Sequence, residues 1–172
     1  MYDKATSQNK TAWEHRAYEA RVNMYGTPQE LAREIINNPK GKLRYHANYF
    51  NNIDGKNIAS ICGSDGRRAV AVALQKANAT VFDISEPQKK YALELAEAAG
   101  VKIGYEVGDF CDTDIVKYGE QFAYGLTSVS LSSIQGGSLK TARESLQLLQ
   151  KRIAKYIKAP NKIRGFFVQS QK

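Results

Sequence analysis

The segment NIASICGSDGRRAVAVALQKANATVFD, residues 57–83, decides the fold. A short apolar run leads into a glycine-containing turn at 63–66, and alanine, valine and leucine at helical spacing follow over 67–78. A second apolar run then ends at Asp83. Two strands joined by a helix through short connections are typical of parallel pairing with a right-handed crossover. The segment therefore predicts one strand–helix–strand unit.

The same alternation continues toward the C-terminus. Residues 86–99 have one broad apolar face and precede a glycine, so they predict a second helix. Residues 101–107 predict a third strand, which Gly108-Asp109-Phe110 closes. The pattern as a whole predicts an α/β fold, a Rossmann-like parallel sheet with short connections.

Before this unit, residues 1–55 are expected to be helical. Residues 11–25 predict a helix that stops at Gly26. Thr27 and Glu30 have the spacing of a capping box at the start of a second helix, with a proline at its first position. Asn37-Asn38-Pro39 is expected to end that helix, and 43–51 to form a third, although its alternation also allows a strand.

After Phe122 the pattern is different. Residues 123–137 are rich in serine and glycine, with one strand that could lie near 126–131. Apolar residues at three- and four-residue steps predict a basic amphipathic helix over 138–158, and 163–168 could form a final strand. A shortened sheet of three strands would leave an open edge and an uncovered face. We expect this segment, or a second copy in a homodimer, to cover them.

Composition is that of a globular protein, with 42% apolar and 24% charged residues. The net charge of +8 lies entirely in residues 130–172, which hold nine basic residues and one acid. A basic segment of this kind can bind nucleic acid or form a solvated surface, and we favour the second. No apolar run is long enough for a membrane span, and the polar N-terminus lacks the features of a signal peptide, so a cytoplasmic location is expected. The two cysteines do not have zinc-ligand spacing, and no metal is expected.

Three polar features follow three successive predicted strands, at the edge where parallel sheets bind ligands. The turn at 63–66 allows a close approach of backbone to a ligand. Asp83 could accept hydrogen bonds from ribose hydroxyls, and Asp109-Phe110 could contact a base through a carboxylate and a ring. Each feature taken alone also suits an ordinary turn or helix cap. Ser85 is the better cap for the following helix, which leaves Asp83 free for a ligand.

The stretches KNIASICGSDGRRAVAVALQKANATVFDIS and YALELAEAAGVKIGYEVGDFCD resemble class I S-adenosylmethionine (SAM)-dependent methyltransferases. With an N-terminal segment of the type W-x-x-x-AYEARV…GTPQELA, the resemblance covers about residues 11–122. It implies one SAM-binding domain over 1–172, made of a helical cap (1–55), a Rossmann-like half (56–122) and an atypical basic tail (123–172). The implied contacts are Gly63, Ser64, Asp65 and Gly66 around the methionine part, Asp83 with Ile84 at the ribose, and Asp109 with Phe110 at the adenine.

The resemblance implies methyl transfer from SAM to an unknown acceptor. Such a transfer depends mainly on holding donor and acceptor in line, so it demands no acid or base, and the catalytic residues stay unknown. The two histidines, His15 and His46, are expected to be structural or exposed. Three alternatives stay open: a non-catalytic SAM-binding remnant, an NAD-binding oxidoreductase, and a nucleic-acid-binding protein that uses residues 138–172.

Overall fold

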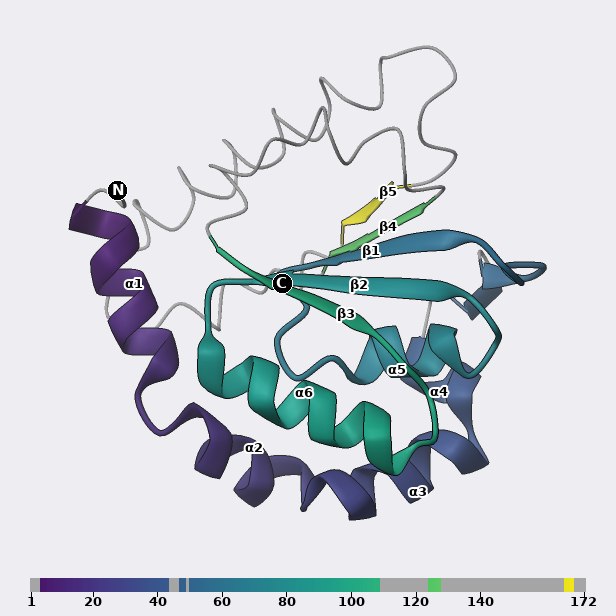
Figure 1. Ribbon diagram of the computed structural model, residues 1–172, viewed down its shortest axis with the longest axis horizontal. Helices are drawn as coiled ribbons and strands as arrows, with labels where there is room; N and C mark the ends of the chain where they lie inside the picture. The colour runs from purple at the N-terminus through teal and green to yellow at the C-terminus, as the bar shows by residue number, and fades with distance from the viewer. Residues whose placement is uncertain (1–3, 44–46, 49, 109–123, 128–165, 169–172) are drawn as a thin grey trace, which may run out of the picture.

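The computed structural model describes residues 4–43, 47–48, 50–108, 124–127 and 166–168 (Figure 1). The helices and strands, in chain order, are α1 (Lys4–Glu14), α2 (Ala17–Tyr25), α3 (Pro28–Asn37), α4 (Pro39–Leu43), β1 (Asn57–Ile61), α5 (Arg67–Ala73), β2 (Asn78–Asp83), α6 (Glu86–Ala98), β3 (Gly104–Val107), β4 (Tyr124–Thr127) and β5 (Phe166–Val168). The predicted α/β fold class is confirmed. None of the helices in these ranges is long and apolar enough to cross a membrane.

The strands form one parallel sheet in the order β3-β2-β1-β4-β5. Ser60 of β1 is in register with Val81 of β2 on one side and Leu126 of β4 on the other. The chain builds outward from β1 to β3 and then returns to place β4 on the opposite side of β1. This reversal makes the carboxyl ends of β1 and β4 the topological switch point of the sheet, where open α/β sheets bind their ligands.

The segment after Phe122 covers the free edge of the sheet with two short strands, as one of the expectations had it. β4 pairs with the free side of β1, and β5 pairs with β4. The strand expected near 126–131 begins earlier, at Tyr124, and the strand expected within 163–168 is found at Phe166–Val168. A four-residue strand that contains Gly125 has too little apolar pattern to stand out, and its place is fixed by the edge of β1 that it completes. The helix predicted over 138–158 lies outside the described residues.

The main core lies between the sheet and the helices α2 to α6, which Figure 1 shows on one side of the strands. Side chains alternate across the sheet, so Ile58 and Val81 belong to this core. Ala59, Ile61 and Phe82 form a separate buried cluster. Buried positions on both faces of β1 are typical of a parallel sheet.

The single helix predicted over 11–25 is two helices. Arg16 has φ 49° and ψ 30°, a left-handed conformation that separates α1 from α2. In α2, Met24 is 63% exposed, whereas Tyr18, Val22 and Tyr25 pack against the core. Sequence periodicity did not detect the break, because arginine is not one of the residue types that usually end a helix.

The predicted start of α3 is confirmed. Thr27 Oγ1 accepts a hydrogen bond from the Glu30 N–H, and the Glu30 carboxylate accepts one from the Thr27 N–H. Pro39 does not only end this region; it also begins α4, since proline fits the first turn of a helix. Of the helix expected over 43–51, α4 includes only Leu43; residues 47, 48 and 50 lie in 3₁₀ turns, and 44–46 and 49 lie outside the described residues. α5 likewise ends at Ala73, before the predicted 78, and the chain turns through Lys76 at φ 66°.

The capping box gives a prediction about pH. The pKa of the Glu30 carboxyl is lowered, chiefly because the Thr27 N–H donates to it. A lowered folded pKa means that the stabilisation is complete above the unfolded pKa and is lost as the pH falls through the folded pKa. Thermal melts of wild type and Glu30→Gln at a series of pH values should therefore show wild type more stable at pH 7. The difference should disappear in acid, and a difference that is independent of pH would contradict this account.

β5 gives a prediction about truncation. Deletion of residues 166–172 removes the partner of β4 and leaves that short strand as an edge. Since each main-chain hydrogen bond contributes roughly 0.5–1.5 kcal/mol, the free energy of unfolding should fall by about 1–3 kcal/mol. Deletion of 169–172 alone, which keeps β5, is the matched control. Equal denaturant midpoints for the two deletions would show that the β4–β5 pairing does not stabilise the sheet.

Candidate functional site

The loop from Cys62 to Gly66 connects β1 to α5 at the switch point of the sheet. Cys62 and Ser64 both have φ 50°, and Gly66 has φ 70°. A left-handed conformation at a residue with a side chain costs roughly 1–2 kcal/mol. Backbone strain of this kind concentrates at ligand-binding and active sites, where the surrounding structure holds it in place.

The two glycines of this loop are required for different reasons. A Cβ atom at Gly63 would lie 2.6 Å from Ser60 Oγ and 2.8 Å from Val81 Cγ1, so the loop rests directly on β1 and β2. A Cβ atom at Gly66 would lie 2.7 Å from the Cβ of Ala92 on α6, in addition to the positive φ. The loop is thus pressed between the sheet and α6, with its backbone amides near the ends of both strands.

Asp83, at the end of β2, braces this loop. The Ser64 N–H donates to Asp83 Oδ2 at 2.9 Å, and the Ser85 N–H donates to Oδ1 at 3.2 Å. Burial raises the pKa of the Asp83 carboxyl, and the N–H donors of Ser64, Ser85 and Ile84 and the charge of Arg21 act in the opposite direction. A carboxylate offers about four acceptor positions, so these N–H donors leave capacity for a hydroxyl donor of a ligand.

Ser85 caps α6, as the sequence predicted. Its hydroxyl accepts from the Gln88 N–H at 3.4 Å. Ile84, between Asp83 and Ser85, is half-buried at the same edge of the sheet. Asp83 is therefore not needed as a helix cap, and its carboxylate is held at the loop instead.

Asp65 is a buried acid with one unpaired oxygen. Its side chain is 2% exposed, and Oδ1 accepts from the Arg67 N–H at 3.2 Å and lies 3.5 Å from Arg67 Nε. Oδ2 has no hydrogen bond, and the Arg21 guanidinium is 3.9 Å away. Ser64 Oγ is also buried without a hydrogen bond. Within the described ranges, Ser64 Oγ and Asp65 Oδ2 are the buried side-chain oxygen or nitrogen atoms that have no hydrogen-bond partner. Since an unpaired buried polar atom costs about 1–3 kcal/mol, both point to a ligand that would complete them.

Tyr105 of β3 supports the loop from the side. Its hydroxyl donates to the Ser64 carbonyl at 2.9 Å, and burial raises its pKa well above the ordinary value for tyrosine, so it stays a donor. The sequence analysis missed Tyr105. A large aromatic residue between Gly104 and Glu106 in a four-residue strand marks an inward position, but the partner lies 41 residues away in the chain.

The sequence analysis also missed Arg21, which α2 brings beside the loop. Arg21 lies four residues after the buried Ala17 and four before Tyr25, so all three share one face of α2. The ring of Tyr25 lies 4.1 Å from the Arg67 guanidinium, a cation–π contact at the start of α5. These contacts place α2 beside the loop and the start of α5.

The structure thus brings together the loop residues 63–66, Asp83 and Ile84. Asp109 and Phe110, predicted at the adenine, lie outside the described residues, as does His46. His15 is exposed on the segment between α1 and α2.

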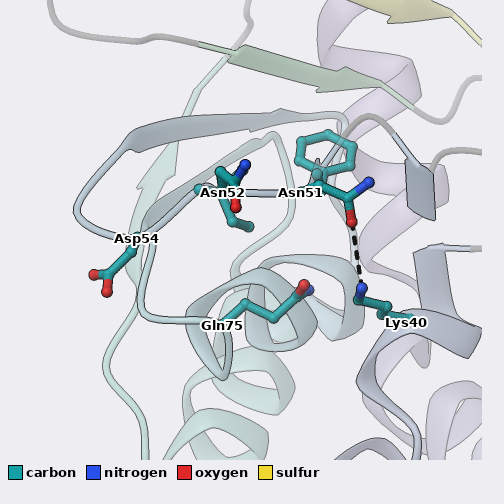
Figure 2. A pocket seen from close by; sticks show the side chains of 7 residues that line it. Lys40, Asn51, Asn52, Asp54 and Gln75 are labelled. Carbon is teal, nitrogen blue, oxygen red and sulfur yellow. Dashed lines mark hydrogen bonds between the residues drawn. The ribbon is translucent and has the colours of Figure 1, made fainter.

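A hollow of about 210 Å³ lies elsewhere, near the residues that precede β1 (Figure 2). It is lined by Lys40, Phe50, Asn51, Asn52, Ile53, Asp54 and Gln75. Lys40 Nζ donates to Asn51 Oδ1 at 3.3 Å within it. This position is at the amino end of β1, whereas ligands of open parallel sheets bind at the carboxyl ends. We therefore keep the loop at 62–66 as the candidate site.

No protein-family model and no curated protein matches the chain. Among solved structures, the magnesium protoporphyrin IX methyltransferase of Synechocystis PCC 6803 with bound SAH has a TM-score of 0.52 and 10% identity, covering 96% of this chain and 83% of that chain. A protein from Methanococcus maripaludis assigned as an SAM-dependent methyltransferase has a TM-score of 0.51 and 16% identity, covering 83% of this chain and 63% of that chain. These likenesses show that the chain has the Rossmann-like fold of SAM-dependent methyltransferases, as the sequence resemblance implied.

Other similar structures align with this chain over a smaller part of their own length. An RNA methyltransferase from Salinibacter ruber, in complex with S-adenosylhomocysteine, has a TM-score of 0.39 and 20% identity, covering 46% of this chain and 52% of that chain. The chain spans 55% and 20% of two further matched chains. The chain thus spans about half, or less, of the length of these matched proteins.

The tight packing of the loop gives a prediction with a close control. Gly66→Ala introduces a positive-φ alanine whose Cβ would meet Ala92, whereas Gly100→Ala has the same φ of 70° with open space around it. Both variants carry backbone strain, but only the first also overpacks α6, which costs about 1–3 kcal/mol more. In urea unfolding, the free energy of unfolding of Gly66→Ala should be lower than that of Gly100→Ala by that amount. Equal midpoints would mean that α6 moves away from the loop at little cost.

Proposed function

We propose that this chain binds SAM at the carboxyl ends of β1 and β2 and transfers its methyl group to an acceptor. The observation that carries the proposal is the pair of unpaired buried atoms, Ser64 Oγ and Asp65 Oδ2, in a strained loop beside Asp83. A ligand with donor groups at this loop would satisfy both atoms. The shared fold with SAM-dependent methyltransferases supports the same assignment.

The residues present fit the parts of SAM. Asp65 Oδ2 is an acceptor suited to the α-ammonium of the methionine part, and the bare backbone at Gly63 permits a close approach. Asp83 keeps acceptor capacity for a ribose hydroxyl, as acids at the end of a second strand do in dinucleotide sites. We propose Asp109 and Phe110 as the adenine contacts, because the family resemblance implies them.

SAM, when bound, supplies a methyl group on a sulfonium, which is already an excellent leaving group. The task of the protein is to orient donor and acceptor and to exclude water. Proton transfer is not required for the donor to react, so the exposed position of His15 is consistent with the proposal. The proposal leaves the acceptor unassigned.

Calorimetric titration with SAM, S-adenosylhomocysteine and NAD tests this proposal. Wild type should bind the first two and not NAD. Asp83→Asn should weaken binding of both by about 10- to 100-fold, because the ribose hydroxyls lose a charged acceptor worth about 1.5–3 kcal/mol. Burial opposes the charge of Asp83, so the neutral asparagine should leave the melting temperature close to that of wild type.

Asp54→Asn, an exposed substitution in the hollow at the opposite end of β1, is the control and should bind like wild type. Binding of NAD in place of SAM would favour the oxidoreductase alternative. Binding of SAM without turnover on small-molecule, protein or nucleic-acid acceptors would favour a non-catalytic remnant. Absence of binding to all three compounds would overturn the proposal.

A further inference from the structure

The hollow near the amino end of β1 has polar walls over an apolar floor. Phe50 and Ile53 form the floor, and both are buried in the main core. The walls come from three segments: Lys40 of α4, the turn at 51–54, and Gln75 just after α5. A space of about 210 Å³ backed by packed core is largely pre-formed, so a small polar molecule can enter it without rearrangement of the fold.

Hydrogen bonds hold the ammonium group of Lys40 at this hollow. Asn51 Nδ2 donates to the Asn48 carbonyl at 2.9 Å, and Asn51 Oδ1 accepts from Lys40 Nζ at 3.3 Å (Figure 2). The Lys56 N–H donates to the Ile53 carbonyl at 3.0 Å and closes the turn between them. An ammonium has three donors, so within the described ranges two N–H groups of Lys40 are left for a ligand.

Two side-chain amides line the same space. Figure 2 shows Asn52 and Gln75 on different walls of the hollow. Gln75 Nε2 donates to the Ala71 carbonyl at 3.1 Å, which leaves Oε1 as an acceptor. Asn52 has φ 59°, a left-handed conformation that asparagine tolerates better than most residues. Since an amide carries both donors and an acceptor, this pair suits the hydroxyl groups of a ligand.

The charge around the hollow is positive. Figure 2 shows the Asp54 carboxylate turned away from the other labelled side chains. Lys40, Lys56 and Lys76 are exposed, and none of them forms an ion pair in the part of the chain that the structure describes. The Gly55 N–H donates to the Lys76 carbonyl at 2.9 Å, so the turn that carries Lys56 lies against the segment that carries Lys76. Three ammonium groups and one carboxylate favour an anionic ligand.

Lys76 stands at a position whose backbone favours glycine. It has φ 66° just after α5, and the N–H of Ala77 donates back to the Val72 carbonyl at 3.2 Å. This hydrogen bond is typical of a helix end at which glycine is the commonest left-handed residue. A lysine there has a higher backbone energy than glycine, and what it adds is a positive charge beside the hollow.

We propose that this hollow binds a sugar phosphate, with the phosphate on Lys40 and sugar hydroxyls on the amides of Asn52 and Gln75. The oxygens of a phosphate accept strong hydrogen bonds from an ammonium group, and amides both donate to and accept from hydroxyls. β1 has five residues, and each extends the strand by about 3.3 Å, so the hollow lies roughly 15 Å or more from the loop at 62–66. It is therefore a second site, and its assignment does not rest on the proposed function.

NMR titrations of the isotope-labelled full chain test this proposal, with ribose 5-phosphate and ribose as probes. Ribose 5-phosphate should shift the amide signals of residues 51–56 and 75–76, with a Kd of about 1 mM for a ligand of this size. Ribose should bind at least about ten-fold more weakly, because it lacks the charged group. Equally tight binding of both probes would contradict the role given to Lys40 and overturn the proposal.

Two substitutions at the hollow should change the affinity for ribose 5-phosphate in opposite directions. Lys40→Gln should weaken binding by about 5- to 10-fold, because a charge-assisted contact at the surface is lost. Asp54→Asn should strengthen it by about two-fold, because a nearby negative charge is removed. Damage to the fold would not produce such a gain. Lys102→Gln removes an exposed lysine outside the lining with the same change in net charge, so it is the matched control and should bind like wild type.

A short single-stranded RNA carries the same ribose phosphate unit within a strand. Tighter binding of this RNA than of ribose 5-phosphate, with the same dependence on Lys40, would support the site and identify nucleic acid as the source of the unit. Binding of ribose 5-phosphate alone would support the site and identify a free sugar phosphate as the ligand.

Asp83→Asn separates the hollow from the ribose contact proposed at the other end of the sheet, and it should bind ribose 5-phosphate like wild type. Loss of binding in Asp83→Asn but not in Lys40→Gln would assign the probe to Asp83 and overturn the proposal. Equal weakening by Lys40→Gln and Lys102→Gln would reduce the effect to general charge attraction and overturn it as well. So would the absence of any shift at about 10 mM probe, where a millimolar site is nearly filled.

Discussion

The close contact of the loop at 62–66 with two different elements is the constraint on which the rest of the structure depends. Gly63 rests on Ser60 and Val81, so β1 and β2 must be in their observed register beneath it. Gly66 touches Ala92, so α6 must approach within a distance that no larger residue would allow. The loop then has little freedom, and its left-handed residues are held in place by packing rather than by their own preference.

The electrostatics of the site follow from this placement. Asp65 is carried into the protein by the loop and is flanked by Arg67 on one side and Arg21 on the other. A buried ion pair is weak evidence for stability, because the loss of hydration offsets much of the attraction. An incompletely paired cluster of this kind is better explained by a ligand that completes it. Asp83 adds a second carboxylate beside the loop. It accepts a hydrogen bond from the Ser64 N–H and keeps acceptor positions free.

The order of the strands gives this cluster its place in the fold. Because β4 lies beside β1 and not beside β3, the carboxyl end of β1 is at the point where the chain reverses direction across the sheet. At such a switch point of an open α/β sheet, ligands bind outside the carboxyl ends of the strands. Identities of 10% and 16% to the methyltransferases with this fold show that the arrangement persists while most side chains change.

The sequence by itself determined the strand–helix alternation from residue 57 to 107, the capping box of α3, and the position of Asp83 at a strand end. These features depend on residues within a few positions of one another, where periodicity and turn chemistry act. Only the tertiary structure decided that β4 completes the free side of β1, that a left-handed Arg16 divides α1 from α2, and that Arg21 and Tyr105 reach the loop. The contacts of Arg21 with Asp65 and of Tyr105 with Ser64 join residues more than 40 positions apart. No local pattern records such contacts, because they exist only when the helices have packed on the sheet.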